Sequence, residues 1–500
     1  MIFPAAGNDI ILAILAFGII LIPAIIIHEL GHFFAARLVG INVLEFGIGF
    51  PPRVGRLFMW GETEFTLNLL PLGGFVRPLG EDMIGPAGHD KVKRDRETLE
   101  DRYDQRGSGL SEREQLRLRG VKAHRMKSVN DAPPLARIFF MAAGALANFG
   151  LAMILFFIVA LIGLPTEVGG LAQLVAIPDG SLLSDSPAEV GDAIEMVNGE
   201  RFDDFEAFYN ILESYGEETI TFSFLRQATG EPYTATVKPN FERRRAFVQV
   251  VGVLEESPAF QAGIQAGDLL THINSTLIPA TGDAAAVLQQ ITRDYEGRVL
   301  SLTFLRDLED GEQLQVEIRV VPRVNPPEGE GRLGVAIRSQ FGLHDETRFA
   351  NAGYKSELIP QSISAAISHS LHTTRTTFEL IASIPGRLLD GSLSGRDARP
   401  ISIIGISKIG GEFLQRSLQE GPGLMLNFIA LISIFLGISN LLPIPALDGG
   451  RIVFVLLEML RGKPINPRVE ARIHQIGILL LLVLGVIIMI VDLLDPPSIT

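Results

Sequence analysis

Residues 10–32 read IILAILAFGIILIPAIIIHELGH, an uncharged apolar run that ends in two histidines with a glutamate between them. The apolar part is long enough to cross about 30 Å of hydrocarbon as a helix. It has no positively charged start and no small-residue cleavage site, so we expect a retained spanning helix rather than a signal peptide. Ionisable groups at membrane depth are costly and are functional candidates by default.

The histidines and the glutamate have the spacing of a catalytic metal site. His28 and His32 are four residues apart, so a helix places both imidazoles on one face, where they can bind one Zn²⁺ ion. A carboxylate at Glu29 can take a proton from a water molecule that zinc activates. Two merely structural helix histidines would leave Glu29 unexplained in this apolar setting. The pattern therefore predicts His28 and His32 as zinc ligands and Glu29 as the general base.

A catalytic zinc ion needs a third protein ligand, for which Asp448 is the best candidate. It lies in residues 440–450, NLLPIPALDGG, at the end of a later apolar run. Pro443 and Pro445 break the helix there, and a broken helix at membrane depth is tolerated where it lines a protein cavity. A capping aspartate at the membrane boundary is the alternative. His89, His124, His369 and His372 lack an adjacent acid in this arrangement, and we expect them to be solvated or structural.

The composition is that of a membrane protein. The chain has 500 residues, 47% of them hydrophobic, and its mean hydropathy is positive. It has no cysteine, so disulfides and thiolate metal sites are impossible and a metal must bind histidines and carboxylates. The formal net charge of −14 argues against nucleic acid as a partner, because phosphate binding needs a basic face.

Four stretches are long and apolar enough to span a bilayer: Ile10–Arg37, Ile138–Leu164, Gly423–Leu447 and Ile473–Leu494. Lysines and arginines concentrate in the loops between the first two and between the last two. The positive-inside rule places these loops in the cytoplasm, and both termini and residues 165–422 outside. We therefore expect a multi-pass protein of the cell inner (plasma) membrane, with the site toward the cytoplasmic side.

Residues 41–76 show short strand-like patterns between glycines and prolines, and predict a hairpin-like element directly after the first span. An ordinary surface loop is the alternative. We expect Glu64–Leu69 to offer a strand edge to which an extended substrate could pair. Residues 82–131 mix charges of both signs and predict a solvated insert, partly helical or disordered.

Residues 165–325 contain a weak internal repeat, in which Ser-Pro-Ala precedes a Gly-Asp pair at 186–192 and again at 257–268. An apolar strand and a hairpin turn at Asn198 or Asn274 follow each pair. The repeat resembles tandem PDZ domains of the bacterial type, with peptide ligands expected. Generic β-rich modules that bind no peptide are the alternative. Residues 363–381 then show one apolar stripe at helical spacing, which we expect to pack on protein rather than on the membrane surface.

The HELGH sequence, residues 440–450 and the PDZ-like repeat together resemble the site-2 protease family, of the bacterial regulator-of-sigma-E protease type. The resemblance implies that His28, His32 and Asp448 bind zinc and that Glu29 is the catalytic base. It implies that Asn440 helps to hold substrate near the metal, and that Gly144–Asn148 packs against the catalytic helix. It also implies that residues 41–76 form a membrane-reentrant β-element that receives the substrate as an added strand.

The fold implied is a multi-domain polytopic α-helical membrane protein with four transmembrane helices, the membrane-reentrant β-element and tandem extracytoplasmic PDZ-like β domains. The activity implied is zinc-dependent endopeptidase cleavage of single-span membrane proteins or peptides, such as a pre-trimmed anti-sigma factor or signal-peptide remnants, with membrane lipid around the enzyme. The expected segments, in order, are 1–40, 41–80, 81–135, 136–164, 165–240 and 241–325 (the PDZ-like pair), 326–422 (linker and amphipathic helix), 423–450, 451–472 (cytoplasmic loop) and 473–500.

Three functions from other classes stay open on the sequence alone. A catalytically silent scaffold that collects peptides has no use for Glu29 beside two metal ligands. A protease of the soluble zincin type needs a downstream glutamate as third ligand, and the apolar spans offer no convincing one. A transporter built from broken helices does not account for the HExxH pattern.

Overall fold

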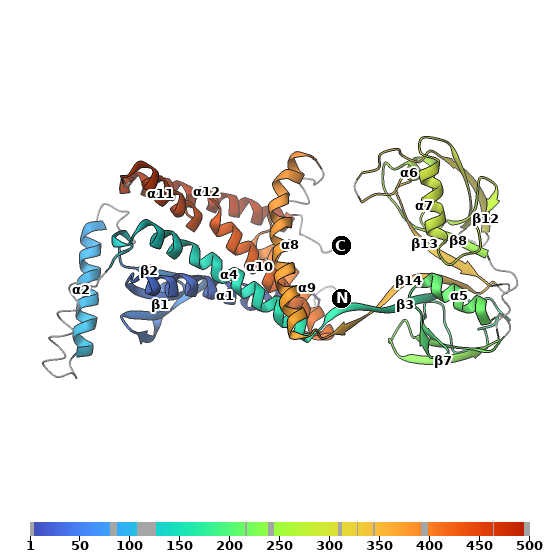
Figure 1. The fold of residues 1–500 in the computed structure, drawn as a ribbon, viewed down its shortest axis with the longest axis horizontal. Helices are drawn as coiled ribbons and strands as arrows, with labels where there is room; N and C mark the ends of the chain where they lie inside the picture. Colours follow the sequence, from blue (N-terminus) through green and yellow to red (C-terminus); the bar gives the residue numbers. More distant parts are fainter. Residues whose placement is uncertain are drawn as a thin grey trace. The chain divides into compact units, whose positions relative to one another are not determined.

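The computed structural model describes residues 5–80, 88–107, 127–215, 218–238, 245–308, 313–327, 329–343, 346–391, 399–463 and 465–494. The chain forms two compact units (Figure 1). The first comprises Met1–Leu164 and Pro360–Thr500, and the second is Pro165–Ile359. The first unit carries the long apolar helices and the HELGH sequence, and the second is rich in strands.

Four helices of the first unit are long and apolar enough to cross a membrane, in agreement with the four predicted spans. They are α1 (Ala5–Val39), α4 (Pro134–Ile162), α10 (Gly423–Leu441) and α12 (Pro467–Leu494). Helices α1, α4 and α10 pack on one another, whereas α12 buries little of its surface. Gly31 brings α1 against α4, since a Cβ on it would lie 2.3 Å from the Ala143 carbonyl oxygen. Small residues permit such close helix packing in a membrane.

The third apolar stretch ends earlier than its sequence suggests. Helix α10 stops at Leu441, and a separate helix, α11 (Asp448–Arg461), begins at Asp448. Proline lacks the N–H that a helix needs and disfavours helical backbone in the residue before it, so Pro443 and Pro445 end α10. The helix break predicted at Pro443 and Pro445 is therefore confirmed, and the expected segment 423–450 holds all of α10 and the start of α11. Most of the expected loop 451–472 is helical, in α11 and at the start of α12.

Residues 43–78 form a small sheet rather than a surface loop. Strands β1 (Val43–Trp60) and β2 (Thr63–Pro78) are bent, so each contributes two segments to it. Residues 64–67 pair with 45–48 on one side and with residues from 55 to 59 on the other. Residues 74–78 pair with 43–48. The expectation that Glu64–Leu69 is a strand edge is therefore wrong, and the edge strands of this sheet are residues 53–60 and 74–78.

Part of the charged insert packs on this sheet. Helix α2 (Gly88–Gly107) buries Leu99 completely, in contact with Leu44 and Leu79. Arg102 of α2 donates hydrogen bonds to the carbonyl oxygens of Leu44 and Glu62, at 2.8 and 3.0 Å. This segment is therefore a docked helix rather than a freely solvated one, and residues 108–126 of the predicted insert lie outside the described residues. A short 3₁₀ turn, η2 (Val129–Asp131), leads into α4.

The second unit is built on a 12-stranded sheet. Its path runs β12-β11-β9-β8-β13-β14-β3-β4-β6-β7, with β10 paired to β9 and β5 paired to β4. The strands are β3 (Leu164–Ala176), β4 (Ala193–Val197), β5 (Glu200–Arg201), β6 (Ile220–Leu225), β7 (Pro232–Val237), β8 (Arg245–Val253), β9 (Leu269–Ile273), β10 (Thr276–Leu277), β11 (Leu300–Asp307), β12 (Gln313–Val320), β13 (Val335–Gly342) and β14 (Arg348–Ile359). The helices are α5 (Phe205–Tyr215), α6 (Pro258–Ala262) and α7 (Ala284–Asp294).

The sheet carries two hydrophobic cores, and one module is inserted into the other. The inserted module, residues 245–338, has its own core around Leu270, Leu302 and Phe304. The outer module consists of residues 165–238 and 339–359, because Phe341 and Phe349 pack on Phe208 with ring centroids 5.8 and 5.5 Å apart. Residues 335–342 and 348–359, expected to be linker, are therefore strands, and from residue 339 onward they complete the outer module.

The repeat in the sequence matches a repeat in the structure. Hairpins β4–β5 and β9–β10 turn at Asn198 and Asn274, both with positive φ, as the sequence predicted. The aspartate before each hairpin is buried against an arginine, Asp192 with Arg226 and Asp268 with Arg306. Burial raises the pKa of Asp192, but hydrogen bonds from the Tyr233 hydroxyl and two backbone N–H groups outweigh it and bring the pKa below its ordinary value.

Two amphipathic helices follow the second unit, α8 (Ile363–Leu389) and α9 (Ile403–Glu420). Helix α8 packs on α4, where the Ser370 hydroxyl donates to the Met153 carbonyl oxygen at 2.7 Å. The expectation that the apolar stripe packs on protein is confirmed only for its later part, where Thr374 is buried and Phe378 and Ile381 pack on the spanning helices of the same unit. It is wrong for Ile363, Ile367 and Leu371, which are exposed.

Candidate metal centre

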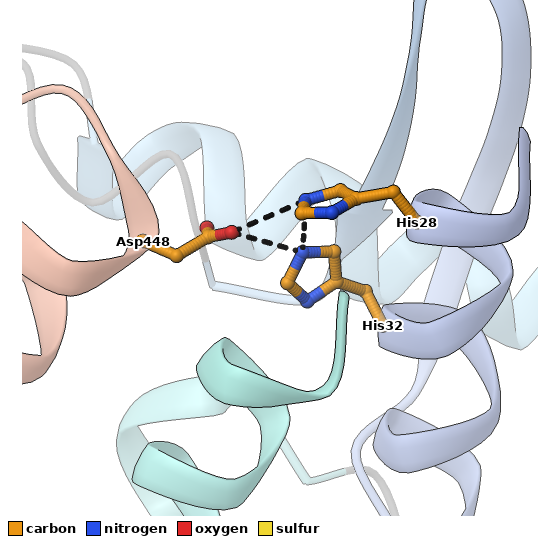
Figure 2. A group of neighbouring side chains, drawn as sticks. All are labelled: His28, His32 and Asp448. Atoms are coloured by element: carbon orange, nitrogen blue, oxygen red, sulfur yellow. Dashed lines mark hydrogen bonds and ion pairs between the residues drawn. The ribbon is translucent and has the colours of Figure 1, made fainter. Parts of the chain in front are cut away.

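Three predicted residues meet at one point (Figure 2). His28 and His32 project from α1, and Asp448 reaches them from the start of α11. The two Nε2 atoms are 3.2 Å apart, and the Asp448 Oδ2 atom lies 3.3 Å from His28 Nε2 and 3.2 Å from His32 Nε2. Both histidines are buried, with 8% and 7% of their surface exposed. Among the residues that the structure describes, these three form the one such group of possible metal ligands.

The spacing of the three atoms fits zinc. A tetrahedral Zn²⁺ ion about 2.0–2.1 Å from each ligand atom separates those atoms by about 3.3 Å. The separations of 3.2 and 3.3 Å agree with that value. Two imidazoles and one carboxylate, with a fourth position left for water, are also a donor set that catalytic zinc uses.

One face of α4 holds the histidine rings. The Phe140 carbonyl oxygen accepts a hydrogen bond from His32 Nδ1 at 2.8 Å, which leaves Nε2 of a neutral ring free to bind a metal. One turn later, a Cβ on Gly144 would lie 2.4 Å from His32 Nε2 and 2.6 Å from His28 Nε2. Another turn on, the fully buried Asn148 amide lies 3.4 Å from His28 Nδ1. Residues 140, 144 and 148 therefore form one stripe against the two histidines.

The orientation of the Asn148 amide bears on the metal. As placed, its nitrogen faces His28 Nδ1, and its buried Oδ1 is without a hydrogen-bond partner among the described residues. Amide oxygen and nitrogen are assigned from hydrogen bonding, and the exchanged orientation lets Oδ1 accept a hydrogen bond from the His28 Nδ1–H group. That arrangement frees His28 Nε2 as a metal ligand, as the Phe140 carbonyl does for His32.

The turn before α11 aims Asp448. Glycine is required after it, because a Cβ on Gly449 would lie 2.3 Å from the carbonyl oxygens of Leu441 and Leu442. Helix α11 is also tied to α4, by an ion pair of 2.8 Å between Arg137 and Glu458. The two prolines end α10, and the turn that follows therefore places the Asp448 carboxylate beside the histidines.

Glu29 and Asn440 are placed differently. Glu29 lies against the edge strand of the sheet, where a Cβ on Gly74 would be 3.0 Å from its Cγ. The Asn440 amide donates to the Leu436 carbonyl oxygen of its own helix at 3.1 Å. A role for Asn440 near the metal therefore stays a prediction. Sequence reasoning missed His474, which accepts the Ala446 N–H at 2.9 Å. An ionisable residue inside an apolar span was the signal that could have found it.

The sequence of this chain matches a known protein family and several known proteins. The sequence profile of peptidase family M50 matches residues 14–484. A regulator of sigma E protease from Haemophilus influenzae is 29% identical over 497 residues, which are 94% of this chain and 95% of the relative. The regulator of sigma-E protease RseP of Escherichia coli is 28% identical over 499 residues, 95% and 96% of the two chains. A putative zinc metalloprotease from Ralstonia nicotianae is 27% identical over 501 residues, again 95% and 96%.

Proposed function

The chain belongs to peptidase family M50, the site-2 proteases, and is a zinc metalloprotease of the membrane; on that premise we propose that His28, His32 and Asp448 hold the catalytic zinc ion and that Glu29 is the general base. The observation that carries the proposal is the convergence of three ligand atoms from two helices at 3.2 to 3.3 Å. The resemblance to site-2 proteases is confirmed by the family match.

The residues divide the chemistry between them. Bound Zn²⁺ supplies Lewis-acid activation of water and of the scissile carbonyl. Glu29, one residue from a ligand but outside the ligand set, accepts the proton of the attacking water and returns it to the leaving amine nitrogen. Helix α4 keeps the imidazoles in position through the Phe140 carbonyl and the Asn148 amide.

We place substrate entry at the edge strand next to Glu29. A spanning helix hides its carbonyls in backbone hydrogen bonds, so a substrate must unwind before it is cut, and its freed groups need partners in hydrocarbon. Residues 74–78 pair with 43–48 on one side, and their other side can pair with an extended chain by β-augmentation. The contact between Gly74 and Glu29 puts this edge beside the general base. Asn440 would hold the substrate backbone nearby.

The second unit is proposed to be a pair of PDZ-like domains on the extracytoplasmic side of the inner membrane. A cavity of about 440 Å³ lies between α7 and residues 335–337 of β13, and its floor includes Leu288, Leu333 and Ile337. A groove between a strand and a helix suits an extended peptide. We propose that the pair excludes substrates that keep a folded ectodomain, so that a trimming cut comes first.

Two experiments test these proposals. The topology predicts that a cysteine introduced at Ser108 is not labelled by an impermeant thiol reagent in intact cells. Labelling there would reverse the orientation. The filter predicts that removing the second unit allows cleavage of untrimmed substrates. The deletion must span residues 165–359, because deletion to residue 325 would remove β8 and β3, on which β13 and β14 pair.

Zinc content and peptidase activity test the site itself. Replacing His28, His32 or Asp448 with alanine should remove both zinc and activity, whereas Glu29→Gln should remove only activity. Retention of zinc in the three alanine variants would exclude the proposed ligand set.

A further inference from the structure

The loop that precedes Asp448 has few hydrogen bonds within itself. It runs from Leu442 to Leu447, and two of its six residues are prolines without an N–H group. Ile444 and Leu447 donate within the loop, at 2.7 and 3.2 Å. Ala446 donates instead to another helix, to His474 Nδ1 of α12 at 2.9 Å.

Ala446 also has a backbone conformation that alanine rarely adopts. Its φ is +85°, in the left-handed region, where a Cβ crowds the neighbouring carbonyl oxygen. Such a conformation persists only where the surroundings impose it. Ala446 lies two residues before the carboxylate that faces the histidines, so its backbone direction determines where Asp448 points.

His474 contacts both flanks of the aspartate. Its ring accepts the Ala446 N–H on one flank, and on the other it packs on Phe454 of α11 with ring centroids 5.3 Å apart. Gly477, one turn further along α12, allows this approach, because a Cβ there would lie 2.5 Å from the Pro445 carbonyl oxygen. His474 is 8% exposed in a helix that otherwise buries little of its surface.

An apolar side chain would be sufficient if this position only filled space. A ring nitrogen that accepts a backbone N–H is a specific requirement, because a buried N–H without a partner is costly. Accepting at Nδ1 places the proton of the neutral ring on Nε2, which is buried without a hydrogen-bond partner among the described residues. The polar contact of the buried ring in the described part of the chain is therefore the one to Ala446. The ring therefore acts on the loop as a fixed hydrogen-bond acceptor.

We propose that His474 is a positioning residue for the metal site: it holds Ala446 in the left-handed conformation that directs Asp448 to His28 and His32. This inference rests on the proposed role of Asp448 as a zinc ligand. The contacts of His474 among the described residues are with Ala446 and Phe454 rather than with His28, His32 or Asp448. His474 acts through the backbone of residues 446–448.

Two substitutions separate hydrogen bonding from packing. His474→Phe keeps a ring of similar size and removes the acceptor, whereas His474→Asn keeps an acceptor close to the position of Nδ1 and removes most of the ring. Gln475→Phe, at the exposed neighbouring position, is the matched control for adding a phenyl group to α12. Zinc retention is measured by competition with a chelator on the purified full-length chain, and kcat and KM are measured on a membrane substrate.

We expect His474→Phe to lose zinc at about tenfold lower chelator concentration, at the lower end of the effect of residues that orient metal ligands. The value of kcat should fall with little change in KM. His474→Asn should recover most of the loss. Ala446→Gly should restore zinc retention in the His474→Phe background, because glycine adopts a positive φ without the Cβ penalty. A residue needed only for packing would not be rescued by a glycine in the loop.

The opposite results overturn the inference. If His474→Phe retains zinc as the wild type and Gln475→Phe do, the hydrogen bond does not position Asp448. If His474→Asn is as weak as His474→Phe and Ala446→Gly restores nothing, the ring only packs. Asp448→Ala is measured in parallel. If that variant keeps its zinc, the proposed ligand set has failed; if it loses zinc while His474→Phe does not, only the role of His474 is refuted.

Discussion

Gly144 offers a sharp test of the metal site, because it faces both histidines from a helix that supplies no metal ligand. In Gly144→Ala the new methyl group would lie 2.4 Å from His32 Nε2 and 2.6 Å from His28 Nε2. Van der Waals contact needs about 3.5 Å, so the rings or the helix must move by about 1 Å. Gly150 on the same helix has nothing within 4 Å of an added Cβ, so Gly150→Ala is the matched control.

The required movement is larger than a zinc site tolerates. Metal–ligand distances are held within about 0.2 Å of their ordinary values. The rings cannot shift alone, since His32 is hydrogen-bonded to the Phe140 carbonyl oxygen and His28 lies against the Asn148 amide. Both groups belong to α4, so a retreat of that helix would break the contacts that orient the rings. We expect zinc affinity to fall by about 100-fold, the upper end for loss of orienting interactions.

Metal analysis of purified protein, combined with circular dichroism and thermal unfolding, measures this outcome. Gly144→Ala should retain helical content and bind less than one zinc ion per chain, while Gly150→Ala should match the wild type in zinc and activity. If Gly144→Ala bound one zinc ion per chain and cleaved substrate at the wild-type rate, the proposed packing of α4 against the ligands would be incorrect.

Other predictions follow from the same structure. Glu29→Gln should keep zinc and lose about 10²–10⁴-fold in kcat, the range for a general base; loss of zinc in that variant would mean that Glu29 has been misassigned. Phe75→Pro should impair cleavage of a membrane substrate without removing zinc. Gly55→Pro, on the opposite edge of the sheet, should leave cleavage unchanged, and equal effects of the two variants would contradict substrate pairing at residues 74–78. The lowered pKa of Asp192 means that its ionised form stabilises the second unit above the ordinary carboxyl pKa, and that this stability is lost as pH falls through the lowered value. At pH 7, Asp192→Asn should therefore unfold at a lower temperature than the wild type, and its unfolding temperature should depend less on pH between 7 and 3. Asp203→Asn, at an exposed position, is the control and should unfold as the wild type does.

The two histidines of the candidate metal site could be predicted from the sequence because their pattern is local. The i, i+4 spacing of His28 and His32 fixes a shared helix face, and an apolar run makes any ionisable group in it conspicuous. Asp448 is 416 positions beyond His32 in the numbering, and what identified it was the broken helix around it rather than any spacing. The structure then brings the three together.

The features that were missed depend on pairing between distant segments. Periodicity suggests strands at residues 43–70, but it does not show which segments pair. Each strand bends and contributes two segments to the sheet, so residues 64–67 pair on both sides. A linear repeat likewise does not show that one β-module is inserted into the other. Phe341, Leu343 and Phe349 complete a core whose other buried members lie more than a hundred residues earlier. Helix α2 reads as a polar segment because its contact with the sheet rests on few apolar residues, Leu99 among them.

Zinc K-edge X-ray absorption of the purified full-length chain tests the central claim most directly. The account predicts a four-coordinate spectrum with two imidazoles and oxygen donors at about 2.0–2.1 Å, and loss of that spectrum in Asp448→Ala. The Glu29→Gln variant should keep the wild-type ligand shell. A wild-type spectrum without two imidazoles, or one that is unchanged by Asp448→Ala, would contradict the site built from His28, His32 and Asp448.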